Sequence, residues 1–350
     1  KDEKAIRDQA GKVVEELKKR TVAEPSADKT LPDAAVFKNA YDKFESSFDS
    51  EHGGFGNAPK FPRVATHDLL HHLAATNTPD TPKALEMSNT TLDAINRGGV
   101  HDHLGGGFHR YSVDRFWHVP HYEKMLYDQA QLAMAFIEGD RLKHNPSFEA
   151  AARDIFSYVS RVLTHPDGGF FSAEDADSLA SADADHKTEG AFYIWTKAEI
   201  DKLLGDDAAL FNAVYGVENG GNSPPGSDPH GDLKGQNTLI LRLDTAAAAK
   251  QFKLTEDEVR SRLASASKRL FEAREKRSHP HLDDKVLTAW NGLMISAYAR
   301  AHKQFGDPAY LKSATRAAEF IEKNLHDPKR GVLLRSYREG SSDIDGFAAD

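Results

Sequence analysis

The chain has 350 residues, a net charge of −9 and no cysteine. The missing cysteine excludes disulfides and thiolate chemistry, and the acidic charge argues against a nucleic-acid partner, since phosphate binders carry a basic face. No apolar run approaches the roughly 18 residues that a membrane helix needs, so no membrane partner is expected. With no signal-peptide pattern at its start, we expect the chain in the cytoplasm or the mitochondrion.

The first segment is charged and helical in pattern, KDEKAIRDQAGKVVEELKKR. Because the chain does not begin with methionine, we expect a trimmed chain or a piece of a longer protein. We interpret residues 1–30 as a linker helix that follows a missing N-terminal domain. Residues 31–350 are interpreted as one helical domain that is truncated at its C-terminus.

Helical periodicity dominates the rest of the chain, where roughly ten helices are expected. An N-cap residue directly before a proline marks three helix starts: Thr81-Pro82, Asn145-Pro146 and Asp307-Pro308. Thr255 and Glu258 fit a capping box at a fourth. Strands are expected only as short segments, at 191–196, 238–243 and 332–337.

The stretch DRFWHVPHYEKMLYDQA (114–130) gathers titratable and aromatic side chains at the start of one predicted helix. Apolar residues at three- and four-residue spacing predict this helix from about His121, with Pro120 at its first turn. Free N–H groups at this end favour anionic or carbonyl oxygens, and the positive helix end would keep the His121 imidazole neutral.

The same helix predicts a division of roles between its two faces. Tyr122, Met125 and Leu126 share the apolar face and are assigned to the core. His121, Glu123 and Asp128 are assigned to a cleft. Lys124 is expected as a solvated residue or as a partner of Asp128, four positions further along.

A second pattern recurs after helices, as an acid and glycines before an aromatic residue. It is seen in DSEHGGFG (49–56), DHLGGGFHRY (102–111) and HPDGGFFS (165–172), with a degenerate copy in HDPKRGVLLRS (326–336). Simple helix caps are one reading. The recurring aromatic favours a repeated helical hairpin, which either stacks as an open solenoid or closes into an α/α toroid. The glycine- and proline-rich stretch 215–236 is expected as a surface loop.

Five ordered motifs carry a resemblance to a known family: GGVHDHLGGGFHRYSVDRFWHVPHYEKMLYDQAQLA (98–133), EDADS (174–178), EGAFYIW (189–195), GQNTL (235–239) and DDKVLTAWNGLMISAYARA (283–301). Across roughly residues 35 to 349 the chain resembles the spermatogenesis-associated protein 20 family. The resemblance implies a thioredoxin-like domain, absent from this sequence, followed by a six-hairpin α/α toroid similar to N-acylglucosamine 2-epimerase and six-hairpin glycosidases.

The fold class expected is therefore all-α, an (α/α)6 six-hairpin toroid that is incomplete, with a few short strands in loops. DGFAAD (345–350) resembles a motif that opens a further hairpin, so the last hairpins are expected to be missing and the ring to be open. The missing N- and C-terminal segments are then expected partners of this chain. The loops at 101–121, 172–178 and 283–291 are expected to meet at one mouth.

Three chemistries fit the polar residues of these loops. Histidine can move a proton between the two faces of a carbon beside a carbonyl, which suits sugar epimerisation or isomerisation, and His121 with His103 is the preferred pair. Paired carboxylates hydrolyse glycosidic bonds, with Glu174 and Asp175 facing Glu123 or Asp128. The simpler interpretation is that the histidines and acids cap helices or bond backbone amides.

The third chemistry is a metal site. HDH (101–103) and HVPH (118–121) give close histidines, but neither spacing is a strong zinc signature, and we predict neither a metal nor a cofactor. The remaining residues assigned to ligand binding are His118, Asp128, Asp177, Lys285, Trp290 and Asn291. Trp290 also falls on the apolar stripe of its helix, so core packing is an equal alternative for it.

The sequence thus favours a toroid that binds a small carbohydrate-like ligand, with sugar isomerase or epimerase activity as the leading enzyme hypothesis. An inverting glycoside hydrolase is the second. A non-catalytic module that supports the missing thioredoxin-like domain is the third, and whether the protein is an enzyme stays open at this point.

Overall fold

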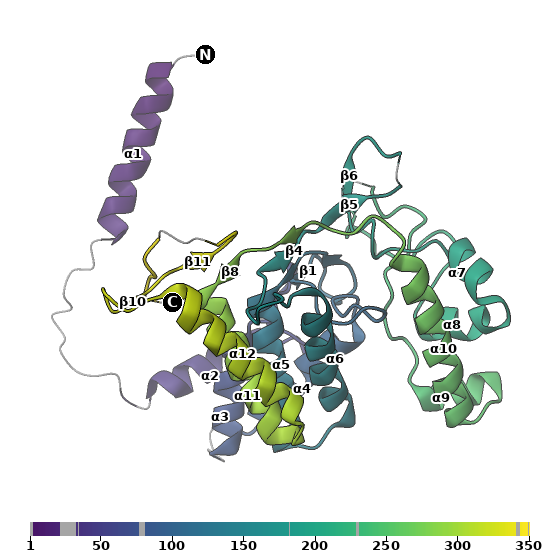
Figure 1. Cartoon of the computed structure of the whole chain (residues 1–350). Helices are drawn as coiled ribbons and strands as arrows, with labels where there is room; N and C mark the ends of the chain where they lie inside the picture. The colour runs from purple at the N-terminus through teal and green to yellow at the C-terminus, as the bar shows by residue number, and fades with distance from the viewer. Residues whose placement is uncertain are drawn as a thin grey trace. The chain divides into compact units, whose positions relative to one another are not determined.

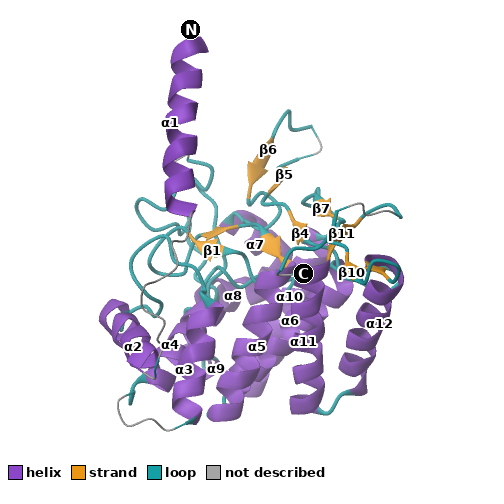
Figure 2. Cartoon of the chain, turned by 90° about the vertical axis from the view of Figure 1, so that its left-hand side faces the viewer, coloured by secondary structure: helices purple, strands orange, loops and turns teal. Residues whose placement is uncertain are grey.

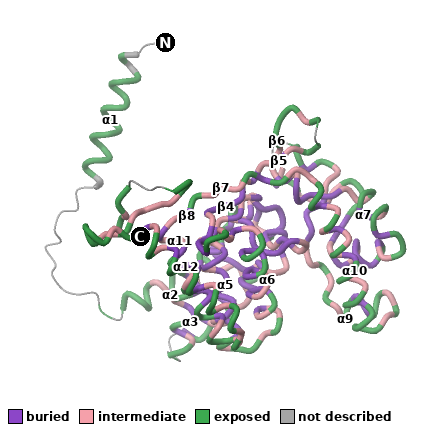
Figure 3. Tube along the Cα trace, in the orientation of Figure 1, coloured by how far each residue is buried: buried purple, intermediate pink, exposed green. Residues whose placement is uncertain are grey.

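The computed structural model describes residues 3–21, 33, 35–76, 81–181, 183–228, 231–340, 344–348 and 350. The chain divides into two units, Lys1–Asn39 and Ala40–Asp350, and the division falls inside helix α2 (Ala35–Ser47). The first unit contains helix α1 (Glu3–Thr21), which lies within the expected linker segment and whose described side chains are exposed (Figure 3). Residues 22–30 of that segment lie outside the described residues.

The second unit consists mainly of helices (Figure 1). Those after α2 are α3 (Val64–Ala75), α4 (Ala84–Arg97), α5 (Leu126–Leu142), α6 (Pro146–Val162), α7 (Lys197–Leu204), α8 (Ala208–Val214), α9 (Thr245–Phe252), α10 (Glu256–Arg274), α11 (Thr288–Phe305) and α12 (Pro308–Leu325), with a 3-10 turn at Gly205–Asp207. None of these, nor any other helix in the described part, is long and apolar enough to cross a membrane.

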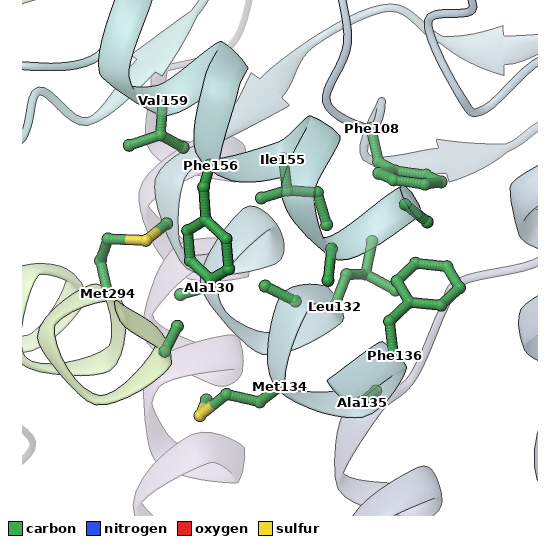
Figure 4. Packing of buried hydrophobic residues seen from close by; sticks show 14 of the residues in the cluster. Phe108, Ala130, Leu132, Met134, Ala135, Phe136, Ile155, Phe156, Val159 and Met294 are labelled. Carbon is green, nitrogen blue, oxygen red and sulfur yellow. The ribbon is translucent and has the colours of Figure 1, made fainter. Parts of the chain in front are cut away.

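Neighbouring helices pack as hairpins, α3 with α4, α5 with α6 and α11 with α12. Helix α5 also packs against α3 and α11, so it has neighbours on several sides (Figure 2). Its side chains are accordingly buried around most of its circumference, as expected for a helix inside a core. Leu132 and Phe136 of α5 pack with Ile155 and Phe156 of α6 and with Met294 of α11 (Figure 4).

Helices α7 to α10 form a second group. Helix α10 packs against α7 and α8 around a separate apolar cluster that includes Trp195, Ile200, Phe211 and Leu270, and against α9 in another cluster that includes Ala248 and Val259. The all-α fold of paired hairpins that the sequence predicts is therefore confirmed. Closure of the hairpins into a six-hairpin ring stays a prediction.

The glycine-aromatic repeats form the same turn three times. In each, a residue after a helix makes a β-bridge with the repeated aromatic, as Phe48 with Phe55, His101 with Phe108 and Thr164 with Phe170. Gly53, Gly106 and Gly168 adopt positive φ in these turns, a conformation that favours glycine. This common geometry confirms a repeated hairpin unit rather than a set of unrelated caps.

The strands lie in the connections at one end of the helices (Figure 2). They are β1 (Tyr111–Ser112), β2 (Pro120–His121), β3 (Lys124–Met125), β4 (Ala173–Glu174), β5 (Asp177–Leu179), β6 (Lys187–Glu189), β7 (Leu282–Asp283), β8 (Val286–Leu287), β9 (His326–Asp327), β10 (Val332–Leu333) and β11 (Ser336–Tyr337). An antiparallel sheet in the order β3-β4-β7 ties together three loops distant in sequence. Of the loops expected to meet at one end of the fold, 172–178 and 283–291 pair through Ala173 and Asp283, and 101–121 joins them through Asp102, which accepts a hydrogen bond from Lys124 in the adjacent strand.

Several local expectations are corrected. Helix α5 begins at Leu126 and not at His121, because residues 120–121 and 124–125 pair with β1 and β4 instead. The expected strands 191–196 and 238–243 are loops, linked by a bridge between Trp195 and Asn237. Helix α4 starts at Ala84 rather than just after Thr81.

Other local expectations are confirmed. Asn145 and Asp307 cap their helices with side-chain oxygens. Thr255 and Glu258 form the capping box at the start of α10. These signals are local, since each involves only a few consecutive residues.

Candidate active site

His121 lies between two carboxylates. Strand β2 pairs with β1 so that His121 stands opposite Tyr111. The Nδ1 atom of His121 is 2.7 Å from Oε1 of Glu189, and Nε2 is 3.6 Å from Oε2 of Glu123. The first distance is that of a charge-assisted hydrogen bond, whereas the second is an ion-pair distance too long for a hydrogen bond.

These carboxylates determine the protonation of the imidazole. Glu123 and Glu189 outweigh partial burial and raise the pKa of His121 to about 9, so the ring is charged at neutral pH. The expected neutral His121 is therefore wrong. The residue precedes the helix instead of standing in its first turn, and acids surround it.

His121 lines a pocket of about 290 Å³. One wall comes from β1 and β2, and another comes from residues 226–228 and 232–233. The Asp228 carboxylate accepts hydrogen bonds from the backbone N–H groups of Gly231, Asp232 and Leu233, which orders this wall. The stretch 215–236, expected as a surface loop, thus contributes a wall to the pocket.

Aromatic rings stack against one side of His121. The Tyr111 ring lies on the imidazole with centroids 5.1 Å apart, and Phe61 lies on Tyr111 at 4.5 Å. Phe61 is 40% exposed. The stack therefore runs from the protein surface to the charged histidine. Tyr111 lines the pocket, and its two ring faces are covered by Phe61 and by the imidazole.

Glu123, which approaches His121, forms an acidic group with Asp128. Arg110 donates a hydrogen bond to Glu123 at 3.1 Å. Burial raises the pKa of Asp128 to about 7, opposed by Arg110 and reinforced by Glu123, and its buried Oδ2 atom has no hydrogen-bond partner in the described part of the chain. A carboxyl group that titrates near neutrality is suited to proton transfer.

The other two histidines assigned to the site lie elsewhere. His103 lines a different, much smaller cavity of about 20 Å³, and its Nε2 atom is 2.9 Å from the carbonyl oxygen of Gly98. Burial, followed by the neighbouring His101, lowers the pKa of His103 to about 3. His118 is also buried, and it borders a third pocket with Arg97. Neither residue lines the His121 pocket.

The acids of the EDADS motif separate. Glu174 is buried and accepts a hydrogen bond from the Tyr158 hydroxyl at 2.6 Å, in a pocket other than that of His121. Asp175 pairs with Lys187 at 3.7 Å. Asp177 stands opposite Glu189 in the β5-β6 ladder, where burial and the neighbouring acids raise its pKa. Asp177 is thus the member of the motif in direct register with a residue of the His121 pocket.

The residues near the start of α11 have mixed roles. Lys285 pairs with Asp283 at 3.1 Å, and Trp290 lies against Tyr127 with ring centroids 4.8 Å apart. Asn291 is fully buried, and its amide bonds both backbone groups of Phe170. Asn291 was expected to bind a ligand, but it belongs to the core.

Several residues important to these pockets were missed by sequence reasoning. Glu189 opens the motif EGAFYIW, which was itself a signal, but the residue was not selected. Asp228 had no local signal. Lys124 was expected to be solvated, but its side chain is 1% exposed and its Nζ atom is 2.8 Å from Asp102. Helical periodicity could not predict this burial, because Lys124 lies in a strand.

The fold and pocket define an all-α protein of helical hairpins with an acidic, aromatic-lined pocket. No family model matches the sequence. It is 41% identical to human spermatogenesis-associated protein 20 over 327 residues, 89% of this chain and 42% of that protein. It is also 41% identical to an uncharacterized Caenorhabditis elegans protein, covering 90% of this chain and 45% of that one. Over the matched segment, the chain is similar to the spermatogenesis-associated protein 20 family.

The chain spans less than half the length of these relatives. Among solved structures, a sugar epimerase from a ruminal bacterium matches with a TM-score of 0.34 and 14% identity over 88% of this chain and 92% of that one. An α-1,6-mannanase from Salegentibacter matches with a TM-score of 0.41 and 12% identity, over 78% of this chain and 50% of that one.

Proposed function

We propose that the His121 pocket binds a carbohydrate-like ligand and catalyses its isomerisation or epimerisation by proton transfer. The observation that carries the proposal is the imidazole held between Glu189 and Glu123, with Tyr111 stacked on its face. Polar groups that converge in a pocket with apolar and aromatic lining residues suit a ligand rich in hydroxyl groups.

The imidazole would act as an acid in this reaction. Its Nδ1 atom is already bonded to Glu189, whereas Nε2 has only the more distant Glu123. Nε2–H can therefore donate to a ligand carbonyl oxygen and stabilise the enediolate that forms when the neighbouring carbon loses its proton. A nearby carboxylate has to accept that proton, and Glu123 and Asp128 are the candidates.

Hydrolysis of a glycosidic bond is the second candidate, because Glu123 and Glu189 stand on opposite sides of one ring. An inverting hydrolase needs room for a sugar and a water between its carboxylates. In this pocket the imidazole occupies part of that space, which favours proton transfer over hydrolysis. A non-catalytic binding module is the third candidate.

Deuterium incorporation separates these alternatives. We suggest incubating the full-length protein in D₂O with glucose, mannose, fructose, N-acetylglucosamine and N-acetylmannosamine, and following by NMR the proton beside the carbonyl group, which is at C2 of the aldoses and at C1 of fructose. Isomerisation would replace that proton with deuterium in at least one sugar, and His121→Gln would slow the exchange by about 100-fold or more. The exposed His326, which lines none of these pockets, supplies the control His326→Gln, expected to retain wild-type rates.

Two other results would count against the proposal. Cleavage of mannan or cello-oligosaccharides without deuterium incorporation would support the hydrolase. Binding of a sugar with neither exchange nor cleavage would support a binding module.

A further inference from the structure

A second pocket, of about 300 Å³, is the one that contains Glu174. Lys124, Glu174 and Leu282 stand next to one another in adjacent strands of the β3-β4-β7 sheet, and all three line this pocket. Helix α6 and the end of α10 complete its walls. The residues that line this pocket and those that line the His121 pocket do not overlap, so the two sites are separate.

The floor of this second pocket is a buried charge cluster. Arg274 makes two hydrogen bonds to Asp102, at 2.7 and 2.9 Å, and Lys124 donates to the same carboxylate at 2.8 Å. Lys124 also donates to the carbonyl oxygen of Gly106 and lies over the Tyr158 ring at 4.4 Å. Each charge is therefore paired before any ligand arrives, which a buried charge requires.

One polar group on the floor is left unsatisfied. Tyr193 is 6% exposed, and its hydroxyl has no hydrogen-bond partner among the described residues. Burial and the carboxylates of Glu174 and Asp102 raise the Tyr193 pKa well above its usual value. Tyr193, Glu174 and Asp102 all line this pocket. A buried hydroxyl without a partner costs free energy, and a ligand that bonds to it recovers that cost.

The charge balance selects the ligand. Lys124 and Arg274 are offset by Asp102 and Glu174 on the floor, and the exposed Arg161 is offset by the exposed Glu275 at the rim. An anion would meet Glu174 and Glu275, whereas a cation would meet Lys124 and Arg274. A neutral molecule with several hydroxyl groups bonds to donors and acceptors of both signs without leaving a charge uncompensated.

We propose that this pocket is a second ligand site, which binds a neutral polyol or free monosaccharide through the hydroxyl of Tyr193 and the carboxylate of Glu174. The ring face of Phe192, which also lines the pocket, supplies an apolar surface for such a ligand. The site does not depend on catalysis at His121.

Ligand-observed NMR titrations of the full-length protein test this proposal. The neutral probe is myo-inositol, which has no carbonyl group and so is not a substrate of the isomerisation proposed for the His121 pocket, and inorganic phosphate and tetramethylammonium are the charged comparisons. Myo-inositol is expected to bind, and both charged probes are expected to bind more weakly. Tyr193→Phe removes only the hydroxyl and should weaken the neutral probe by about five- to tenfold, while His121→Gln should leave this binding unchanged.

A second variant tests whether the ligand occupies the volume of this pocket. Leu282→Trp fills the pocket from β7 and should abolish binding of the neutral probe, with circular dichroism checking that the fold is retained. An unchanged affinity in both Tyr193→Phe and Leu282→Trp would overturn the proposal. So would preferred binding of phosphate or tetramethylammonium, or no binding of myo-inositol. Loss of binding in His121→Gln alone would assign myo-inositol to the His121 pocket and equally overturn this second site.

Discussion

The side-chain amide of Gln129 hydrogen-bonds both backbone groups of Phe108. The Phe108 N–H donates to Oε1 at 2.9 Å, and Nε2 donates to the Phe108 carbonyl oxygen at 2.6 Å. Asn291 makes the same two bonds to Phe170, at 2.8 and 3.0 Å. Each amide is the fourth residue of its helix, so two of the glycine-aromatic turns are fastened to a following helix in the same way.

Gln129→Leu is expected to destabilise the protein by about 2–4 kcal/mol, because it leaves both backbone groups of a buried turn without partners. Gln131→Leu, two residues along the same helix, is the matched control. Gln131 donates only to Tyr127 within its own helix, and its loss should cost less than about 1 kcal/mol. Urea unfolding measures both. Equal losses would show that the amide clamp does not stabilise the turn.

The raised pKa of His121 predicts a pH dependence of stability. The folded-state pKa of His121 is about 9, above the usual 6.5. The charged ring therefore stabilises the folded protein fully below about pH 6.5, and this contribution is lost as the pH rises through 9. The difference in unfolding free energy between wild type and His121→Gln should therefore be largest near pH 6, with an upper bound of about 3 kcal/mol. It should vanish above pH 9.

NMR titration of the His121 ring gives a direct check on that value. Its midpoint should lie near pH 9 in the wild type and fall toward the ordinary value in Glu189→Gln, which removes the hydrogen-bonded carboxylate. A wild-type midpoint near 6.5 would contradict the ion-pair geometry.

Substitution of Asp128 is expected to stabilise the protein, whereas substitution of His121 destabilises it. Its folded-state pKa of about 7 exceeds the usual 3.8, so the folded protein loses stability as pH rises between these values. Asp128→Asn should match wild type near pH 4 and exceed it near pH 8 by on the order of 2 kcal/mol. Thermal melts at both values measure this, with the exposed Asp185→Asn as control. If Asp128→Asn is less stable than wild type at pH 8, the ionised Asp128 carboxylate has a stabilising partner in the folded protein, which would contradict this prediction.

Lys124 and Lys285 form a matched pair for testing buried charge. Lys124→Met removes a cation that is 1% exposed and leaves Arg274 as the cation paired with Asp102, at a cost of about 3 kcal/mol. Lys285→Met removes one partner of an ion pair in which the lysine is 46% exposed, and should cost less than about 1 kcal/mol. Denaturant unfolding compares them. Similar costs would contradict the structural role of the Lys124 cluster.

Sequence reasoning succeeded where the signal is local. The caps at Asn145, Asp307 and Thr255 and the glycine-aromatic turns each depend on a few consecutive residues, so their patterns specify their structures. The helical class and hairpin repeat follow from the same short-range periodicity. The relatives agree with the family resemblance, since they are 41% identical over 89% and 90% of this chain.

The functional residues were decided by pairing between distant segments. His121 was misread as a neutral helical residue because its neighbours in sequence form an amphipathic pattern, whereas strand pairing with β1 delays the helix to Leu126. Glu189, 68 residues away, then supplies the carboxylate that charges the ring. The sequence by itself determined which segments become helices and turns. Only the tertiary structure decided which charges meet, because an ion pair depends on distances in space that sequence spacing does not encode.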